Sequence, residues 1–268
     1  MRIFLPHRPR LLRPIVRVSQ IECAMENYEA WFVRMQPTMT VPCMAYGESV
    51  IGDSKDILYF LSREHPDVGL YPEEHREAID QFLDLFYSQF GVIAQFTFGH
   101  WVRKSTQVRD FIARGKVDTS IAKLKALIQE HPDLKDVGER TLAKKQRMDF
   151  VAFMMAADLP ALDERMKGVL DTMEARLAHT AFVCGDAYTL ADITATAFLA
   201  RVHIVKQEGM FGPHVLKYWR EAIKTRPSFQ QAYVCSNWDE TLMSRQIEAF
   251  ANGLDPASIK WTGPPTVR

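Results

Sequence analysis

The feature that most limits how this chain can fold is the stretch 182–201, FVCGDAYTLADITATAFLAR. Thr189 and Asp192 have the three-residue spacing of a capping box, in which each side chain binds a backbone N–H at the start of a helix. Tyr188 precedes the cap and Ile193 follows it at the fourth helical position, so these side chains can form a hydrophobic staple. Small and apolar residues continue along the same helical face. The stretch therefore predicts a buried helix with a well-specified start, which is a folding signal and not yet a functional one.

Length and charge exclude some classes of function. The chain has 268 residues, enough for one large domain or two smaller ones. Lys and Arg together number 33, and so do Asp and Glu, which gives a formal net charge of zero. General binders of nucleic acids or anionic membranes carry excess positive charge, so we expect neither partner. A run of about 18 apolar residues is absent from the sequence, so we expect no membrane-spanning helix.

The cysteines and the N-terminus bear on the cellular compartment. The cysteines form no CxxC pair and are expected to be buried thiols in a reducing compartment: Cys23, Cys43, Cys184 and Cys235. Five arginines precede the first acidic residue, Glu22, as in a mitochondrial presequence, but three prolines among them interrupt the helix that a presequence needs. We therefore expect a cytoplasmic protein and keep mitochondrial targeting as the alternative.

A β-hairpin is predicted near the N-terminus. Residues 41–45 form an extended apolar run, and Gly47 stands where the first central residue of a type II′ turn belongs. Residues 50–51 are the returning strand. Asp53 or Ser54 then caps a helix that ends before Pro66.

From residue 73 onwards the pattern is helical. Apolar residues at three- and four-residue steps predict helices through residues 79–93, 118–130, 135–157, 162–178, 214–225 and 228–234. The predicted fold class is therefore α+β, with a small β-containing domain at residues 1–68 and an all-helical domain at residues 73–238. Residues 239–268 contain three prolines and are expected to form a mostly irregular tail.

Several catalytic motifs are absent. The sequence has no phosphate-binding loop, dinucleotide fingerprint, zincin helix or nucleophile elbow. Its eight histidines are dispersed, with no spacing typical of a metal site, so we expect no bound metal.

Two short pairs flank the hairpin and indicate a binding surface. A proline at the start of a strand, as in Val41-Pro42, is compatible with a cis bond that turns the backbone of Val41 out of the sheet. Asp53-Ser54 opens the next helix, whose N–H groups and hydroxyl suit a carboxylate. The two pairs together predict backbone pairing with a peptide at Val41 and anion binding at Ser54.

Two stretches of the chain resemble the glutathione S-transferase family. VPCMAYGESVIGDSKDILYFL looks like the second half of its thioredoxin-like domain, and FVCGDAYTLADITATAFLAR looks like the capped core helix of its helical domain. The resemblance implies glutathione as co-substrate, a cis bond at Val41-Pro42 with Val41 pairing to the cysteinyl unit, and an Asp53-Ser54 pair that receives the γ-glutamyl end. Val41, Pro42, Asp53 and Ser54 are therefore the expected glutathione-binding residues. The family also implies a homodimer.

A closer resemblance is to the branch of tetrachlorohydroquinone reductive dehalogenases and ganglioside-induced differentiation-associated proteins. It rests on ENYEAWFVRM at residues 26–35, on residues 96–100, 124–134 and 226–238, and on an extra helical segment around residues 104–148. The second group of proteins ends in an apolar anchor. Residues 236–268 are polar here, so we expect no anchor.

The N-terminus departs from the family. A complete βαβ unit needs about 30 residues, and fewer precede Glu26, so we expect the thioredoxin-like domain to lack its first strand and helix. In the family the catalytic Ser, Tyr or Cys lies between those elements. Ser19 and Cys23 fall where the second strand belongs, so the catalytic residue is left unassigned.

Two functions remain open. One is a glutathione-dependent enzyme that conjugates or reduces an electrophilic aromatic compound or quinone, with an apolar substrate held in a pocket facing residues 96–103. The other is a non-catalytic protein of the same fold that binds a thiol ligand or another protein.

Overall fold

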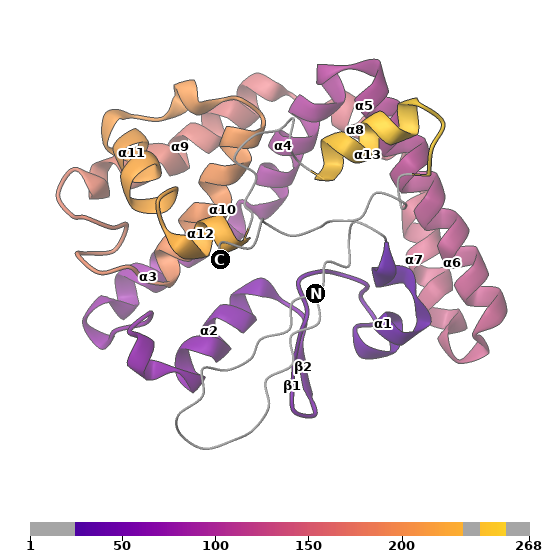
Figure 1. Ribbon diagram of the computed structural model, residues 1–268, viewed down its shortest axis with the longest axis horizontal. Coiled ribbons are helices and arrows are strands. Elements are labelled where there is room, and N and C mark those ends of the chain that lie inside the picture. Colours follow the sequence, from indigo (N-terminus) through magenta and orange to yellow (C-terminus); the bar gives the residue numbers. More distant parts are fainter. Residues whose placement is uncertain (1–24, 233–241, 256–268) are drawn as a thin grey trace. The chain divides into compact units, whose positions relative to one another are not determined.

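The computed structural model describes residues 25–232 and 242–255, and packing divides them into two compact units (Figure 1). Unit 1 takes its described residues from 1–60, 107–153 and 245–261, and unit 2 from 61–106 and 154–244. The four boundaries among these residues fall inside helices α2, α5, α8 and α13. The chain thus passes repeatedly from one unit to the other, whereas the predicted domains follow one another along the sequence. That division stays a prediction.

The predicted α+β class is confirmed, because a small antiparallel sheet lies among helices. Unit 1 contains a 3₁₀ turn at Glu26–Tyr28 and a π-helix at Phe111–Asp118, together with α1 (Ala30–Met35), β1 (Met44–Tyr46), β2 (Ser49–Ile51), α2 (Ser54–Glu64), α5 (Thr106–Asp110), α6 (Thr119–Glu130), α7 (Lys135–Gln146), α8 (Phe150–Met155) and α13 (Leu242–Ala251), some of which run across a boundary. The first strand and helix of a thioredoxin-like domain would lie in residues 1–24, outside the described residues.

The hairpin forms where the sequence predicts it. Strands β1 and β2 pair Met44 with Ile51 and Tyr46 with Ser49, which leaves a two-residue turn. Gly47 has φ +58°, the sign that a type II′ turn requires at its first central residue.

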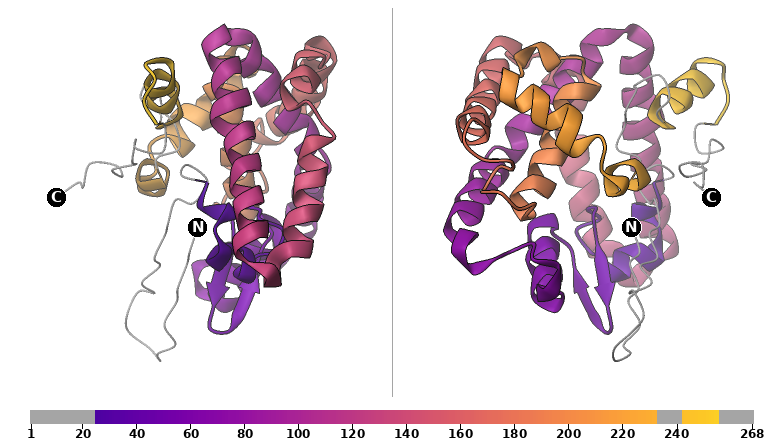
Figure 2. Two further views of the ribbon diagram at one scale, coloured as in Figure 1. Left: turned by 90° about the vertical axis from the view of Figure 1, so that its right-hand side faces the viewer. Right: turned by 60° about the vertical axis from the view of Figure 1, so that its left-hand side comes forward.

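Helices α6 and α7 lie side by side (Figure 2), and the 3₁₀ turn Pro132–Leu134 between them contacts α1. Their apolar faces enclose a buried cluster with the residues around α1: Val33, Met39, Leu124, Leu127 and Leu134. Two ion pairs border the cluster, Lys123 with Glu29 and Arg34 with Asp133. The guanidinium of Arg34 donates hydrogen bonds to both carboxylate oxygens of Asp133 and lowers the pKa of that carboxyl. The pair is half exposed, so the apolar cluster contributes most of the stability at this contact.

Two predicted helices are interrupted. The run predicted over residues 135–157 breaks after α7, because Asp149 accepts a hydrogen bond from the N–H of Ala152 (2.9 Å) and starts α8. The run through residues 79–93 breaks at Gln89, between α3 (Arg76–Ser88) and α4 (Phe90–Lys104). Phe90, expected on the buried face, is 54% exposed.

The tail also contains a helix that the sequence analysis did not predict. Helix α13 occupies ten residues of the stretch expected to be mostly irregular. Ile247 and Ala249 on this helix are buried, and Phe250 packs edge-on against Phe111 with ring centroids 5.9 Å apart. The three prolines all lie after the helix in the sequence.

The regular elements of unit 2 among its described residues are helices, apart from an isolated bridge between Phe182 and Gly185. Unit 2 contains α3, α4, α9 (Leu159–Leu177), α10 (Leu190–Ile204), α11 (Pro213–Lys217), a π-helix at Tyr218–Ile223 and α12 (Pro227–Ala232). Helix α4 packs against α9, and α10 packs against α3.

The capping box of α10 is confirmed. The N–H of Thr189 donates to Asp192 Oδ2 (2.8 Å), and the Thr189 hydroxyl accepts from the N–H of Ala191 (3.3 Å). Thr189 and Asp192 are fully buried. Tyr188, the proposed staple residue, packs edge-on against Phe182 and lies under the guanidinium of Arg226, which is 3.6 Å from the ring centre.

Asp192 does more than cap its own helix. Its carboxylate accepts four hydrogen bonds: from the N–H and hydroxyl of Thr189, from the N–H of Val183 (3.0 Å) and from the hydroxyl of Tyr218 (2.7 Å). Burial raises the pKa of Asp192, and these donors offset part of that effect. The carboxylate thus joins the start of α10 to two other segments of unit 2.

Glu174 has a similar role between α9 and α11. Its carboxylate accepts hydrogen bonds from the N–H groups of His214 (3.0 Å) and Val215 (2.8 Å) and contacts the imidazole of His214. Burial raises the pKa of Glu174, but the hydrogen bonds outweigh it, so the pKa lies below its ordinary value of 4.5. A Cβ on Gly212 would approach the carboxylate to 2.4 Å, which explains the glycine before α11.

Thr189→Ala removes the N-cap hydroxyl of α10. We expect the free energy of unfolding to fall by about 1 kcal/mol, because one helix N–H and Asp192 each lose a partner. Urea denaturation measures the change. Thr172→Ala in the middle of α9 is the matched control, since its hydroxyl only binds the carbonyl of Gly168 within the helix, and it should leave the midpoint almost unchanged. Equal midpoints for Thr189→Ala and the native chain would contradict the capping role.

Glu174→Gln should lower the free energy of unfolding by about 1 kcal/mol at neutral pH, because the start of α11 loses its anion. A carboxyl with a depressed folded pKa contributes stability above its unfolded pKa and loses it as pH falls through the folded pKa. The difference between native and variant chains should therefore be constant above pH 4.5 and shrink below it. A difference that grows as the solution is acidified would be inconsistent with this role.

Candidate functional site

The loop between α1 and β1 presents the backbone of Val41. The Val41–Pro42 peptide bond is cis, as the sequence suggested. Among the described residues, no hydrogen bond joins the N–H or C=O of Val41 to a partner. Both residues are half-buried. Val41 therefore has a backbone donor and acceptor with which an extended peptide could pair.

The start of α2 is the second part of the site. Asp53 is the N-cap: its Oδ1 accepts from the N–H of Lys55 (2.8 Å), and its carbonyl accepts from the N–H of Ile57 (2.9 Å). Ser54 is the first helical residue. Asp53 is exposed, so its carboxylate is accessible to a cationic group, while the helix start beside it favours an anion.

Gln36 joins these two parts, and sequence reasoning missed it. Its Nε2 donates to the carbonyl of Gly52 (3.3 Å) and to the hydroxyl of Thr40 (3.4 Å), so one side chain holds the residue before Val41 and the residue before Asp53. The side chain is 91% buried, since 9% of Gln36 is exposed. No sequence pattern marks this role, because a glutamine at the end of a helix is ordinary.

Gly52 leaves the space that the bridge needs. A Cβ at this position would come within 1.8 Å of Gln36 Nε2, closer than any two such atoms can lie. A side chain at residue 52 would therefore displace Gln36 from its hydrogen bonds.

The loop is also fixed at its entrance. Asn27 is buried and donates from Nδ2 to the carbonyl of Met39 (3.0 Å). Met39 has φ +57°, a left-handed conformation that is uncommon for a residue with a side chain. Asn27 thus supports the turn that leads into Thr40 and Val41.

Two comparisons relate the chain to known proteins. Residues 156–230, which include α10 and its capping box, match the family described as "Glutathione S-transferase, C-terminal domain". The chain is 28% identical over 220 residues to the tetrachloro-p-hydroquinone reductive dehalogenase of Sphingobium chlorophenolicum, across 80% of this chain and 83% of that protein. The chain thus resembles glutathione S-transferases in its C-terminal domain and one dehalogenase over most of its length. Val41, Pro42, Asp53 and Ser54 remain its predicted glutathione-binding residues.

The two described cysteines, Cys43 and Cys184, are buried. Burial raises the pKa of Cys43, which is fully inaccessible, and raises that of Cys184 to about 11. Neither forms much thiolate at neutral pH. The turn expected to carry the family's catalytic residue, together with Ser19 and Cys23, lies outside the described residues.

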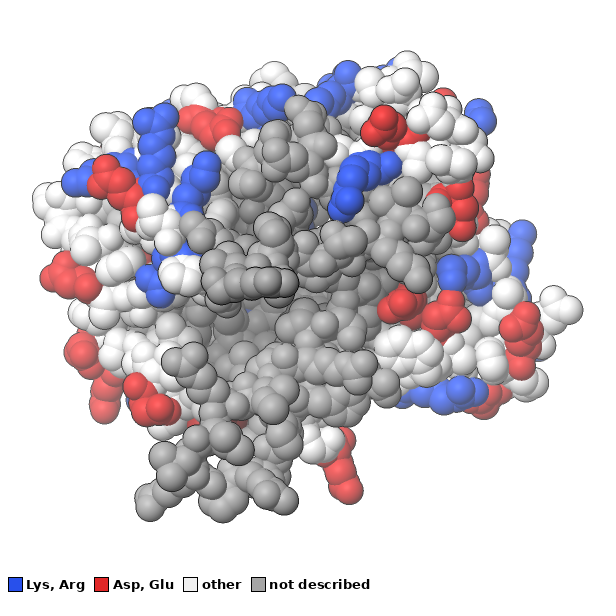
Figure 3. Space-filling model, viewed as in Figure 1, with Lys and Arg blue, Asp and Glu red and all other residues white. Residues whose placement is uncertain are grey.

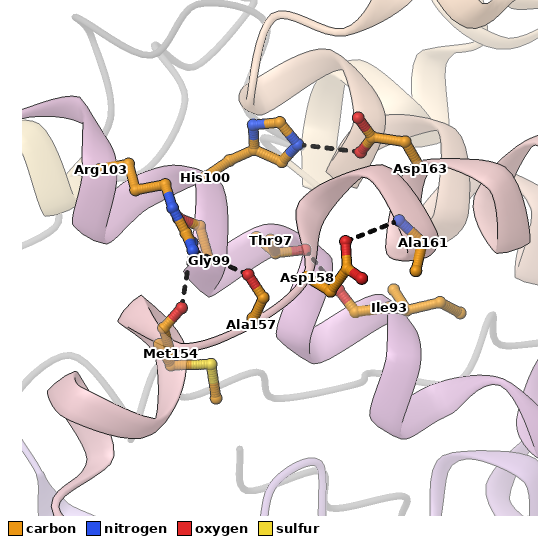
Figure 4. A network of polar contacts seen from close by, with 10 residues as sticks. All are labelled: Ile93, Thr97, Gly99, His100, Arg103, Met154, Ala157, Asp158, Ala161 and Asp163. Carbon is orange, nitrogen blue, oxygen red and sulfur yellow. Dashed lines mark hydrogen bonds and ion pairs between the residues drawn. The ribbon is translucent and has the colours of Figure 1, made fainter.

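In unit 2, Arg103 fixes the stretch predicted to face the substrate (Figure 4). Its guanidinium donates to four carbonyls, those of Gly99, Met154, Met155 and Ala157, at 2.7–3.0 Å. These bonds attach the end of α8 and the residues that connect it to α9 to the last turn of α4. Phe96 is fully buried in the core, so it cannot line a pocket, and the predicted apolar pocket stays a prediction.

Residues 25–232 and 242–255 contain no helix with the length and apolar character to cross a membrane. The same residues bring together no group of three His, Cys, Asp or Glu side chains that could bind a metal ion. On the face shown in Figure 3, basic and acidic side chains are interspersed.

Gly52→Ala tests the Gln36 bridge. We expect the substitution to lower the free energy of unfolding by about 1–3 kcal/mol through overpacking. In a chain that already carries Gln36→Ala, the added methyl group meets no amide, so the same substitution should have a smaller effect. A double-mutant cycle by urea denaturation measures the difference, expected to be at least about 0.5 kcal/mol for residues in contact. Simple additivity of the two changes would show that the bridge does not form.

Proposed function

We propose that the chain binds glutathione through unit 1 and uses its thiol against an electrophilic small molecule. The observation that carries the proposal is the Gln36 bridge, which holds the cis Val41–Pro42 loop and the capped start of α2 as one surface. The resemblance to glutathione S-transferases supports the same ligand.

The chemistry of glutathione matches the two parts of this surface. It is a short peptide, so its cysteinyl backbone can pair with the N–H and C=O of Val41. Its γ-glutamyl end carries an ammonium and a carboxylate. The exposed carboxylate of Asp53 suits the ammonium, and the start of α2 at Ser54 suits the carboxylate.

The bound thiol must lose its proton to react. A free thiol has a pKa of about 8.5, so only a few per cent is thiolate at neutral pH. In conjugation the thiolate forms a carbon–sulfur bond and the leaving group departs with the electron pair. In reduction two thiols are oxidised to a disulfide and the substrate gains two electrons. The reductive dehalogenase similar to this chain makes a halogenated aromatic compound or quinone the first electrophile to test.

Three further properties belong to this proposal. The electrophile is apolar, the chain forms a homodimer, and the protein works in the cytoplasm. Each is an expectation from the sequence and its resemblance.

Asp53→Asn tests the binding site. Asparagine caps a helix as well as aspartate does, so the fold should be kept while the charge for the glutathione ammonium is lost. We expect affinity for glutathione to fall about tenfold, as for the loss of a charge-assisted hydrogen bond. Calorimetric titration measures it. Asp56→Asn, which removes an equal exposed charge from the same helical turn, is the matched control and should bind like the native chain. Equal loss in both variants would reject the assigned role of Asp53.

A second candidate function is non-catalytic binding of glutathione. Binding alone needs only the surface formed by the Val41 loop and the start of α2, and Cys43 and Cys184, both buried with raised pKa values, contribute no reactive thiol to it. Turnover of a chlorinated dinitrobenzene with glutathione separates the two functions. A rate above the uncatalysed reaction supports the enzyme. Retention on immobilised glutathione without any such rate for nitroaromatic, halogenated or quinone substrates supports the binding protein.

A further inference from the structure

Unit 1 contains a surface cavity of about 520 Å³ that takes no residue from the candidate glutathione site. One side of it is formed by the π-helix and the first turn of α6, and the other by the end of α7, the start of α8 and the residues that link them. Every lining residue lies between positions 113 and 151. Small-molecule sites in proteins commonly have volumes of about 300–1,000 Å³, so this cavity has the size of a ligand site.

The two sides of the cavity are largely apolar. Ala113, Val117 and Ile121 follow one another at four-residue steps along the first side. Phe150 and Val151 lie on the second side. All five are half-buried, so each keeps part of its apolar surface exposed. Removing that surface from water would favour the binding of an apolar group.

The first side includes a backbone form that is rare in proteins. The π-helix Phe111–Asp118 has eight residues, whereas most π-helical segments are single turns, often at functional sites. The Phe111 side chain is fully buried, and a Cβ on Gly115 would come within 2.9 Å of its ring, so the glycine makes room for this aromatic anchor. The anchored π-helix places Ala113 and Val117 in the lining of the cavity.

Two carboxylates give the cavity a negative charge. Asp118 and Asp149 line it and are exposed, and neither forms an ion pair with another described residue. The side chain of Asp118 makes no capping bond at the start of α6. Asp149 accepts the N–H of Ala152 through one oxygen, which leaves the second for a ligand. Of the described residues that line the cavity, only Lys145 is cationic, and its ammonium lies 5.3 Å from the ring centre of Tyr28, which is not part of the lining.

We propose that this cavity binds a small organic cation: a primary ammonium group attached to an aromatic ring or a short apolar chain. The ammonium has only donors and would face the carboxylates of Asp118 and Asp149, which are acceptors. The ring or chain would contact the apolar sides. Within the described residues no three ligands gather for a metal ion, so an ammonium suits these carboxylates better. The proposal concerns a separate surface of unit 1 and does not depend on glutathione binding.

The test is calorimetric titration of the full chain at neutral pH with phenethylamine, phenethyl alcohol and methylamine. Phenethylamine, which is protonated at this pH, should bind. Phenethyl alcohol has the ring without the charge, and methylamine has the charge without the ring, so each should bind at least about tenfold more weakly. Saturating glutathione should leave the affinity for phenethylamine unchanged. No binding of phenethylamine, equally tight binding of either partial ligand, or loss of phenethylamine binding in glutathione would each overturn the proposal.

Two substitutions make the test specific to the cavity. Asp118→Asn and Asp149→Asn each remove one negative charge and should weaken phenethylamine binding about tenfold, as expected for the loss of a hydrogen bond to a charged group. Asparagine caps a helix as well as aspartate does, so Asp149→Asn should keep α8 and the native melting temperature. Asp136→Asn, at an exposed aspartate of α7 outside the cavity, makes the same charge change and should not alter affinity. Native-like affinity in both cavity variants, or an equal loss in Asp136→Asn, would refute the site.

Discussion

The buried carboxylate of Asp192 is the interaction on which unit 2 most depends. A charge taken out of water is costly unless hydrogen bonds replace its hydration, and Asp192 receives four. Because the donors come from the start of α10, from Val183 and from Tyr218, the carboxylate is satisfied only when all three segments are in place. The cap of one helix is therefore also a condition on the folding of the unit around it.

Gln36 links separate segments of unit 1 as Asp192 does in unit 2, but through a neutral amide instead of a carboxylate. It fixes the separation between the Val41 loop and the start of α2, while the α6–α7 pair buries the apolar side of α1, the helix that Gln36 ends. A segment late in the chain thus supports a surface encoded near its beginning. Residues 107–153 belong to the same unit as the candidate glutathione site, and they supply Leu124, Leu127 and Leu134 to the buried cluster that includes Val33 and Met39.

Contacts between residues close in the sequence could be predicted from it, whereas contacts between distant residues could not. The capping box, the hairpin turn at Gly47 and the cap at Asp53 each depend on residues within four positions of one another, and each was predicted. The Gln36 bridge spans 16 residues to Gly52, and Arg103 reaches carbonyls more than 50 residues away. Such contacts depend on the folded arrangement and have no sequence period. The breaks at Gln89 and Asp149 were missed for a related reason: the apolar spacing continues across both, so periodicity alone cannot locate them.

Residues whose type does not suit their backbone conformation are informative, because sequence preference and backbone conformation usually agree. Three described residues other than glycine, Met25, Met39 and Lys206, adopt left-handed conformations that glycine would accept more readily. Met39 leads into the Val41 loop, and Lys206 follows the C-terminus of α10. Strain at such positions persists only when neighbouring contacts hold it. Asn27 provides that contact for Met39, and two hydrogen bonds in the Schellman pattern after α10 provide it for Lys206. At Met39 the side chain fills the core beside α6, so packing explains why a residue with a side chain is kept at a left-handed position.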